Sequence, residues 1–182
     1  AIARIVRLRD EGLRHVVDSD IEDFFDRIQH RLLLQQLYRL VPDDAVQELV
    51  ALWLAAIVQD GPRAWLLERG VPQGSPLSPL LANLYLDGFD ERLLAAGHRL
   101  VRYADDFVIL CADAGQARRA LDDARAALVD LQLRMNAAKT RLTHVEQGFT
   151  FLGVRFCGPL VEAVDDDAEP WLLPDAADHQ RV

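Results

Sequence analysis

Apolar residues recur along the chain at two different spacings, which separate predicted strands from predicted helices. Short runs of branched and aromatic residues predict strands, whereas longer segments with apolar residues three or four positions apart predict helices. The predicted strands are residues 14–21, 100–103, 107–110, 140–144 and 149–156. The predicted helices are residues 1–12, 22–40, 44–58, 77–95 and 115–131. This order indicates an α+β fold in which helices cover one face of an antiparallel sheet.

Turn-forming residues mark the breaks between these elements. The helix over 44–58 is preceded by Pro42 and capped by Asp43, and residues 60–62 (DGP) predict a turn. Residues 70–76 form a stiff, irregular loop rich in glycine and proline. The chain from Val164 onward is acidic and contains two prolines, which is typical of a linker or a frayed end.

The net charge of −9 is unevenly distributed. Seven of the 29 acidic residues and one of the 20 basic residues lie from Glu162 onward, which leaves 22 acidic and 19 basic residues before it. A strongly acidic surface would repel a polynucleotide, but a body with a charge near −3 argues only weakly against one.

The sequence shows no sign of export or membrane insertion. Its longest apolar run, residues 49–58, is too short to cross a bilayer and predicts a buried helix. We expect a cytoplasmic protein without a membrane partner. Cys111 and Cys157 are too few for a disulfide framework or a zinc cluster, and their apolar neighbours place them in the core. Because the chain starts inside a helical pattern without methionine, we expect it to be part of a longer protein.

Two adjacent carboxylates, Asp105 and Asp106, lie between two predicted strands, where the chain must turn tightly. Anions packed side by side repel each other and lose solvation, and a divalent cation would relieve that conflict. Asp20 lies where another predicted strand ends and a helix begins. If the strands are neighbours, Asp20 and Asp105 could share two cations about 3.5–4 Å apart, as in phosphoryl transfer. Aspartate is also common in turns and at helix N-caps, so these positions alone leave both alternatives open.

Five motifs in order separate these alternatives. They are residues 20–26 (DIEDFFD), 70–86 (GVPQGSPLSPLLANLYL), 102–110 (RYADDFVIL), 136–140 (NAAKT) and 149–153 (FTFLG). With these motifs the chain resembles the palm of reverse transcriptases, in particular those of the bacterial group II intron-like lineage. The resemblance covers about residues 16–156. It implies a polymerase palm that catalyses RNA-directed DNA synthesis.

The resemblance also implies the metal site. Asp20 and Asp105 match the family's metal-binding carboxylates, Asp106 matches a third supporting acid, and the carbonyl of Ile21 matches a further contact. The expected cofactor is a pair of Mg²⁺ ions, with Mn²⁺ as a substitute. Lys139, the only lysine in the chain, matches a lysine near the nucleotide phosphates that could protonate the leaving pyrophosphate. Its alternative is a solvated surface side chain.

Further matches concern the substrates. Phe25 falls where the family places a bulky residue beneath the incoming sugar, which would exclude a 2′-hydroxyl; its alternative is a core position, for which neighbouring Phe24 is the better candidate. Residues 151–153 resemble a primer grip, a hairpin that sets the primer end, whose alternative is an ordinary core strand. The substrate-binding residues implied by the motifs are Ile21, Asp23, Phe24, Phe25, Pro72, Gln73, Gly74 and Tyr103. The implied primer-grip residues are Phe151, Leu152 and Gly153.

The chain departs from the family pattern at both ends. The family's fingers precede the segment that matches Asp20, and a basic helical thumb follows the segment that matches Phe156. We therefore expect residues 1–13 to be a remnant of the fingers or a connection, 14–158 the palm, and 159–182 an acidic linker or tail. The fingers are then largely missing.

The expected reaction is template-dependent addition of deoxynucleotides to a DNA or RNA primer on an RNA or DNA template. Within the lineage, residues 102–111 and 146–153 resemble CRISPR-associated reverse transcriptases most, whose partner is a fused or associated integrase and whose role is spacer acquisition. Intron maturases, retron enzymes and diversity-generating enzymes stay open. The rival functions are a non-catalytic nucleic-acid-binding or docking module with the palm fold, and a palm-like nucleotide cyclase.

Overall fold

The computed structural model describes residues 1–72 and 74–164. Its helices are α1 (Ile2–Asp10), α2 (Phe24–Arg27), α3 (His30–Leu40), α4 (Asp44–Leu54), α5 (Ser78–Ala95), α6 (Ala114–Asp130) and the 3-10 helix η1 (Val145–Gln147). Its strands are β1 (His15–Ser19), β2 (Ile57–Asp60), β3 (Arg63–Leu66), β4 (Arg99–Tyr103), β5 (Asp106–Cys111), β6 (Arg141–His144), β7 (Phe149–Phe151), β8 (Val154–Cys157) and β9 (Leu160–Ala163). Gln73 and the acidic tail at 165–182 lie outside the described residues.

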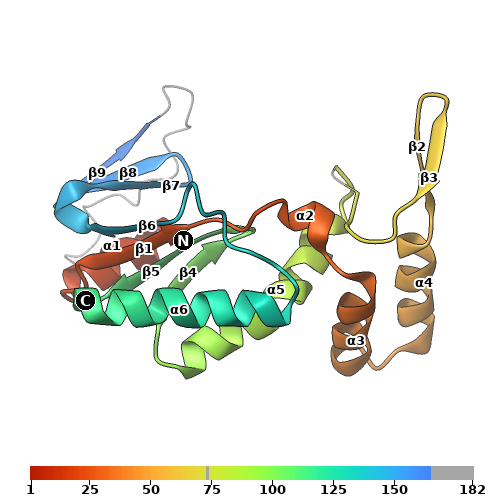
Figure 1. The fold of residues 1–182 in the computed structure, drawn as a ribbon, viewed down its shortest axis with the longest axis horizontal. Helices are drawn as coiled ribbons and strands as arrows, with labels where there is room; N and C mark the ends of the chain where they lie inside the picture. Colours follow the sequence, from red (N-terminus) through yellow and green to blue (C-terminus); the bar gives the residue numbers. More distant parts are fainter. Residues whose placement is uncertain (73, 165–182) are drawn as a thin grey trace, which may run out of the picture.

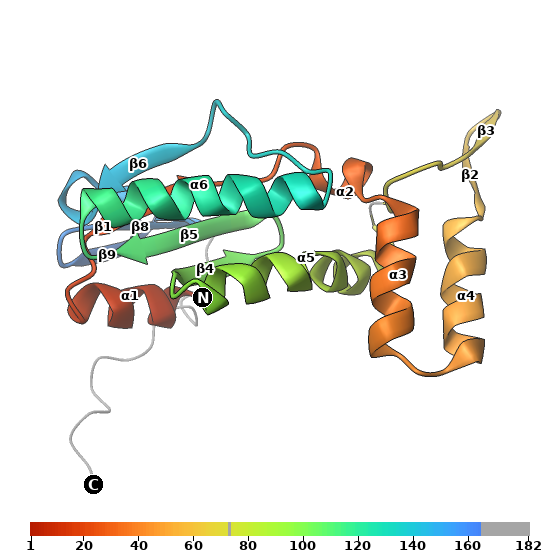
Figure 2. The same cartoon turned by 60° about the horizontal axis from the view of Figure 1, so that its bottom comes forward.

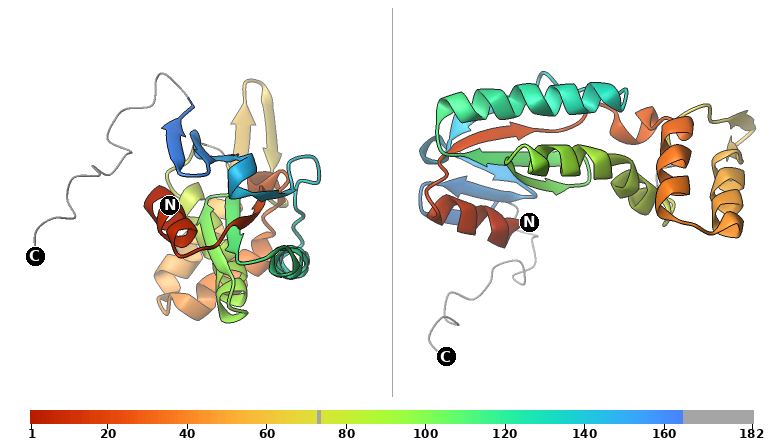
Figure 3. Two further views of the ribbon diagram at one scale, coloured as in Figure 1. Left: turned by 90° about the vertical axis from the view of Figure 1, so that its left-hand side faces the viewer. Right: turned by 90° about the horizontal axis from the view of Figure 1, so that it is seen from below.

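The centre of the molecule is a four-stranded antiparallel sheet with the order β4-β5-β1-β6. Helices α5 and α6 run along one face of this sheet (Figures 1 and 3). The predicted α+β fold with helices over an antiparallel sheet is therefore confirmed. Strand β1 lies between β5 and β6, so a segment near the start of the chain becomes a central strand.

The sheet is buried on both faces, each with its own core. Val17 and Ile109 pack with the residues of α5 and α6. Their neighbours Val16 and Val108 point the other way and pack with α1 and with a second, three-stranded sheet, β7-β8-β9. The strands of the main sheet consequently contain nearly continuous apolar runs rather than an alternating pattern.

The predicted single helix over 22–40 is wrong, because the chain forms two helices with a break at Ile28 and Gln29. Ile28 has an extended backbone (φ −56°, ψ 118°), and its carbonyl accepts a hydrogen bond from the Gly70 N–H at 2.7 Å. A contact with a segment 42 residues away in sequence therefore interrupts the helix. The apolar spacing continues across the break, which is why the sequence pattern does not reveal it.

The predicted helix over 44–58 also ends early, at Leu54. Its N-cap is confirmed, since the Asp43 side chain accepts from the Val46 N–H at 3.0 Å. The branched residues after Ala56 form the hairpin β2–β3, and the predicted turn at 60–62 is the turn of that hairpin. Helices α3 and α4 and this hairpin project from the end of the main sheet (Figure 2). None of the described helices combines the length and the apolar character needed to cross a membrane.

The apolar pattern predicted one strand over 149–156, but the chain forms a hairpin, β7–β8, as the primer-grip resemblance at 151–153 implied. Its turn uses Leu152 and Gly153 with φ values of +52° and +70°. A third strand, β9, pairs with β8, so regular structure continues to Ala163, inside the segment expected to be a tail. Helix α1 is anchored to the turn between β8 and β9, because the largely buried Arg9 donates to the carbonyls of Gly158 and Pro159.

The two cysteines differ in their surroundings. Cys111 is buried in the main core, as predicted, and burial raises the pKa of its thiol to about 11. Cys157 is only partly buried at the end of β8, so its core placement is only partly confirmed. Both are free thiols.

Candidate active site

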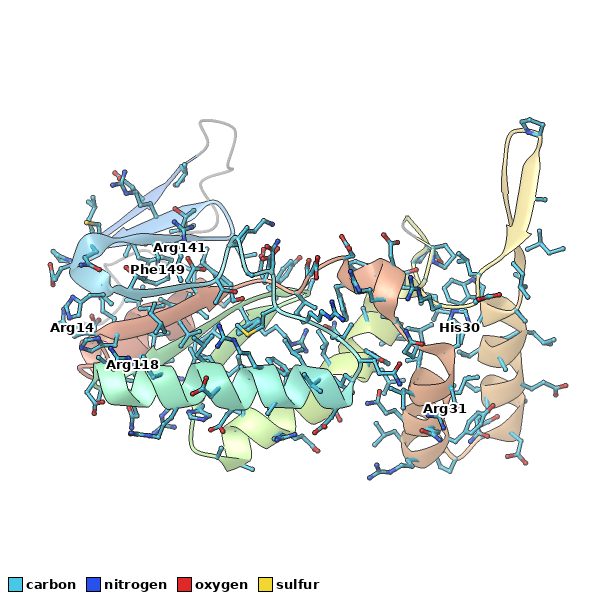
Figure 4. All side chains as sticks on the ribbon, in the orientation of Figure 1. Arg14, His30, Arg31, Arg118, Arg141 and Phe149 are labelled. Atoms are coloured by element: carbon cyan, nitrogen blue, oxygen red, sulfur yellow. The ribbon has the colours of Figure 1, made fainter. Side chains whose placement is uncertain are left out.

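The site lies where β1 ends beside the start of β5. Ser19 pairs with Phe107 in the antiparallel register, so Asp20 and Asp106 emerge at the same end of two neighbouring strands. Asp18, Asp20 and Asp106 line one open cleft between the main sheet and the β7–β9 sheet. Arg141 of β6, labelled in Figure 4, lines the same cleft.

Asp20 is the most deeply buried carboxylate of the cleft. Only 9% of its side chain is exposed, and its Oδ2 accepts a hydrogen bond from Lys139 Nζ at 2.6 Å. Its Oδ1 is buried and has no hydrogen-bond partner among the described residues. A buried carboxylate oxygen without a donor is costly, so this atom is suited to a cation.

The segment before β6 is bound along the backbone on either side of Asp20. Asn136 N–H donates to the Asp20 carbonyl at 3.0 Å, and the Ser19 and Thr140 hydroxyls are hydrogen-bonded at 2.8 Å. Ile21 forms an isolated β-bridge with Met135 on the same side. These bonds bring Lys139, 119 residues away in sequence, to the Asp20 carboxylate.

The turn between β4 and β5 is as tight as predicted. Tyr103 pairs with Asp106 across it, and Ala104 has a φ of +53°, which is uncommon for a residue other than glycine. Asp106 is the first residue of β5 and lines the cleft, whereas Asp105 lies half-buried in the turn and does not.

The charges of the cleft are incompletely balanced. Burial raises the pKa of Asp106, and the nearby carboxylates of Asp105 and Asp20 raise it further, while Lys139 opposes them. Burial also raises the pKa of Asp18, against the opposing charge of Arg141. The hydrogen bond and charge of Asp20 raise the pKa of Lys139. A bound cation would favour the ionised carboxylates.

The donor set fits a magnesium ion in type but is not assembled into a finished metal centre. Within residues 1–72 and 74–164, no three histidine, cysteine or acidic side chains are grouped closely enough to hold a metal. Asp20 and Asp106 nevertheless both line the cleft, and carboxylate oxygens are ligands that Mg²⁺ prefers. The buried, unpartnered Oδ1 of Asp20 is the observation that supports such a site.

The loop at 70–76 is hydrogen-bonded to α2 and to the start of α3. Val71 N–H donates to the Phe25 carbonyl at 2.9 Å, and His30 Nε2 is hydrogen-bonded to the Gly70 carbonyl at 2.6 Å; His30 is labelled in Figure 4. Gly70 has a φ of +82°, and a Cβ there would lie 3.0 Å from the backbone of Asp26 and Phe25. Glycine is therefore required for this close approach.

Phe25 and Phe24 have different environments. Phe24 is 2% exposed and belongs to the core, so its side chain is not available to a substrate. Phe25 is half-buried and lines a pocket with Gly74 and Ser75 of the loop, together with the start of α5. Of the two adjacent phenylalanines, both named as substrate-binding from the motif, only Phe25 has a side chain that lines a pocket.

A profile of the family described as "Reverse transcriptase (RNA-dependent DNA polymerase)" matches residues 4–156. This match covers most of the chain. The chain belongs to the reverse transcriptase family. The match includes the Asp20 and Asp105–Asp106 motifs and the loop at 70–76.

Several curated proteins are similar to this reverse transcriptase segment. Protein YkfC of Escherichia coli is 31% identical over 177 residues, which cover 78% of this chain and 46% of YkfC. The group II intron-encoded protein LtrA of Lactococcus lactis is 35% identical over 83 residues, covering 46% of this chain and 14% of LtrA. The chain thus spans less than half the length of these relatives.

The fold is similar to that of solved telomerases. A structure of apo telomerase from Candida tropicalis superposes with a TM-score of 0.72 at 16% identity, covering 88% of this chain and 39% of the telomerase chain. A structure of telomerase from Candida albicans, in complex with a fragment of telomeric RNA, gives a TM-score of 0.70. At this identity the comparison shows a shared fold.

The remaining motif positions of the reverse transcriptase segment are spread around the cleft. Phe151 and Leu152 line it, and Gly153 completes the β7–β8 turn. Tyr103 is 63% exposed beside the acidic turn. Ile21 is buried in the core, and only its backbone can contact a ligand.

Three other predicted positions are placed less directly. Asp23 has an exposed side chain that pairs with Arg27 at 3.1 Å, at a backbone φ of +48°. Pro72 is partly buried, and Gly74 is exposed beside the Phe25 pocket. Gln73 lies outside the described residues.

The sequence interpretation missed two charged residues of the cleft, Asp18 and Arg141. They form an ion pair with an N–O distance of 3.8 Å, and both line the cleft with Asp20. The signal was present for Asp18, because it lies two residues before Asp20 on a strand and therefore on the same face. No comparable signal marked Arg141.

Proposed function

We propose that the protein containing this chain is an RNA-directed DNA polymerase, and that this chain supplies its catalytic palm. The reaction is addition of deoxynucleotides to a primer 3′-hydroxyl on an RNA template, releasing pyrophosphate. The observation that supports it best is the meeting of Asp20, Asp106 and Lys139 in one cleft from three distant segments. A nucleic-acid-binding surface would gain nothing from clustered anions facing a phosphate backbone.

The residues that would hold two Mg²⁺ ions, or Mn²⁺ in their place, are Asp20, Asp105, Asp106 and the carbonyl of Ile21. When bound, the ions supply activation of the primer hydroxyl and neutralise charge on the leaving pyrophosphate. Lys139 holds its proton at Nζ beside Asp20, where it can be given to the leaving pyrophosphate. Arginine holds its proton too firmly for that role.

The primer and the incoming nucleotide would contact different parts of the chain, one at the cleft and one at the Phe25 pocket. The β7–β8 turn, with Phe151 and Leu152 on the cleft, would hold the primer end. The loop at 70–76 would contact the incoming nucleotide, and Phe25 would lie beneath its sugar. RNA template, DNA or RNA primer and deoxynucleoside triphosphates are the proposed partners.

Replacing Phe25 with alanine is expected to admit ribonucleotides. The phenyl ring lines the pocket beside Gly74, and its removal opens space for a 2′-hydroxyl. We expect the incorporation efficiency of a ribonucleotide relative to its deoxynucleotide to rise about 100-fold, the range open to steric discrimination. The measurement is kcat/KM for each nucleotide, with Phe25→Tyr as the control that retains the ring. Unchanged sugar selectivity in Phe25→Ala would show that the Phe25 ring does not exclude ribonucleotides.

The function is tested by primer extension with the full-length parent protein. On an RNA template with Mg²⁺ we expect deoxynucleotide addition that stops when the metal is chelated. Tight binding of the primer–template without any extension would favour a docking module in place of the polymerase.

We further propose that the parent protein belongs to the group II intron-like bacterial lineage and is cytoplasmic. We also propose a CRISPR-associated role with a fused or neighbouring integrase. Reading the parent open reading frame and its neighbours tests them. A spacer-integrating endonuclease in or beside the frame supports the CRISPR role, and a maturase domain within an intron overturns it.

A further inference from the structure

Arg102 of β4 makes a hydrogen-bond network that the proposed chemistry does not use. Its Nε and Nη2 donate to the two carboxylate oxygens of Asp90 at 2.8 and 2.6 Å. Its Nη1 donates to Asn83 Oδ1 at 3.1 Å and to the carbonyl of Ala104 at 2.8 Å. One guanidinium therefore connects helix α5 to the turn that carries the paired acids.

The Arg102–Asp90 pair is largely sheltered from solvent, whereas Asn83 is exposed. The Arg102 side chain is 10% exposed and that of Asp90 28%. A two-pronged pair between a guanidinium and a carboxylate is strong and fixes direction, and a lysine ammonium cannot reproduce its planar fork. Asn83 and Asp90 are seven residues apart on α5, two helical turns, and so lie on one face toward β4.

The Ala104 carbonyl is the important acceptor. Ala104 has a φ of +53°, a conformation that costs about 1–2 kcal/mol for an L-residue with a Cβ. The conformation decides the direction in which the next residue, Asp105, leaves β4. A donor fixed at the Ala104 carbonyl can hold the peptide in this orientation.

The other end of α5 is tied to the loop at 70–76. The Ser78 hydroxyl, at the first residue of the helix, donates to the Pro72 carbonyl. Ser78 and Pro79 also line the Phe25 pocket. Helix α5 therefore contacts the loop at its start and, through Asn83 and Asp90, the acidic turn farther along.

We propose that Arg102 is a positioning residue: with Asp90 and Asn83 it fixes the Ala104 carbonyl and thereby the carboxylates of Asp105 and Asp106. Helix α5 then sets the distance between the acidic turn and the loop that would contact the nucleotide. The catalytic part of this inference rests on the proposed polymerase function; the fixing of the turn does not.

The test uses Arg102→Lys in the full-length protein. We expect kcat for primer extension to fall about 30-fold, the loss of one to two hydrogen bonds to a charged group, while KM for the deoxynucleotide changes less than about threefold. Hydrogen exchange of the peptide across Tyr103 to Asp106 should accelerate about tenfold, because the turn opens more often. Asp90→Asn should change both readouts in the same direction.

The matched control is Arg92→Lys. Arg92 lies on α5 and, like Arg102, pairs with an acid, Asp130, but among the described residues it makes no hydrogen bond to the β4–β5 turn. It should leave kcat and the exchange of the turn unchanged, and thermal melting verifies that each variant is folded.

The outcomes separate the two claims. Faster exchange of the turn in Arg102→Lys with a wild type that extends no primer would refute the polymerase and leave the positioning role standing. Normal exchange of the turn in Arg102→Lys would overturn the positioning role, whatever the activity. An equal loss of kcat in Arg92→Lys would also overturn it.

Discussion

Replacing Asp20 with asparagine is expected to lower kcat for primer extension at least about 1,000-fold in the full-length protein. The substitution keeps the shape of a side chain that is 9% exposed, and it removes the charge from the atom suited to a cation, Oδ1. A factor of about 1,000 corresponds to about 4 kcal/mol of transition-state stabilisation, within what a catalytic metal supplies. Single-turnover kinetics on an RNA template measure it.

Asp26→Asn is the control for this prediction. It makes the same chemical change six residues later, on the exposed side of α2 and outside the acidic cleft. It is expected to leave kcat within a factor of two. A kcat for Asp20→Asn within tenfold of the wild type, with both variants folded, contradicts the role given to Asp20.

Lys139→Arg is expected to lower kcat about 100-fold, at the lower end of the contribution of a general acid. Arginine keeps the positive charge beside Asp20 Oδ2, where Nζ now lies at 2.6 Å, but it releases its proton far less readily. The variant therefore separates charge from proton donation. The measurement is kcat at saturating deoxynucleotide.

The reference for this variant is Arg125→Lys, on an exposed part of α6, which should leave kcat unaltered. If Lys139 contributed only its positive charge, arginine could replace it without loss of kcat. A loss smaller than threefold in Lys139→Arg would therefore end its assignment as the proton donor.

The strands and the acidic turn were predictable because their signals are local. Runs of branched residues end at Asp20 and flank Asp105 and Asp106. The five motifs, in their order along the chain, indicated the reverse transcriptase family. The resemblance to the family placed Lys139 near the nucleotide phosphates, and its contact with Asp20 was not predicted. The bonds that bring it there, from Asn136 and Thr140, depend on the packed fold.

The errors come from contacts between distant segments. The break at Ile28 is decided by the Gly70 N–H, and nothing in the spacing of apolar residues near Ile28 reports it. The hairpin β2–β3 was hidden because its first residues continue an apolar run of α4. Strand β9 was hidden because Glu162 reads as the start of an acidic tail, although it pairs with Arg155 in the sheet.

The structure differs most from the family motif in which of the two adjacent carboxylates, Asp105 or Asp106, lines the cleft. The family motif assigns the metal to Asp105, whereas the structure places Asp106 on the cleft with Asp20. The geometry of the β4–β5 turn explains this difference. Asp106 lies on the same face of β5 as Val108 and therefore faces the second sheet, whereas Asp105 lies in the turn itself, where the chain reverses direction.

The most direct measurement is anomalous diffraction from Mn²⁺ in crystals of the full-length protein with a primer–template and an unreactive deoxynucleotide. We predict a manganese ion held by the carboxylate of Asp20 together with the Asp105–Asp106 pair, next to the nucleotide phosphates. Manganese bound without Asp20, or carboxylates too far apart for one cation to bridge in that complex, would contradict it.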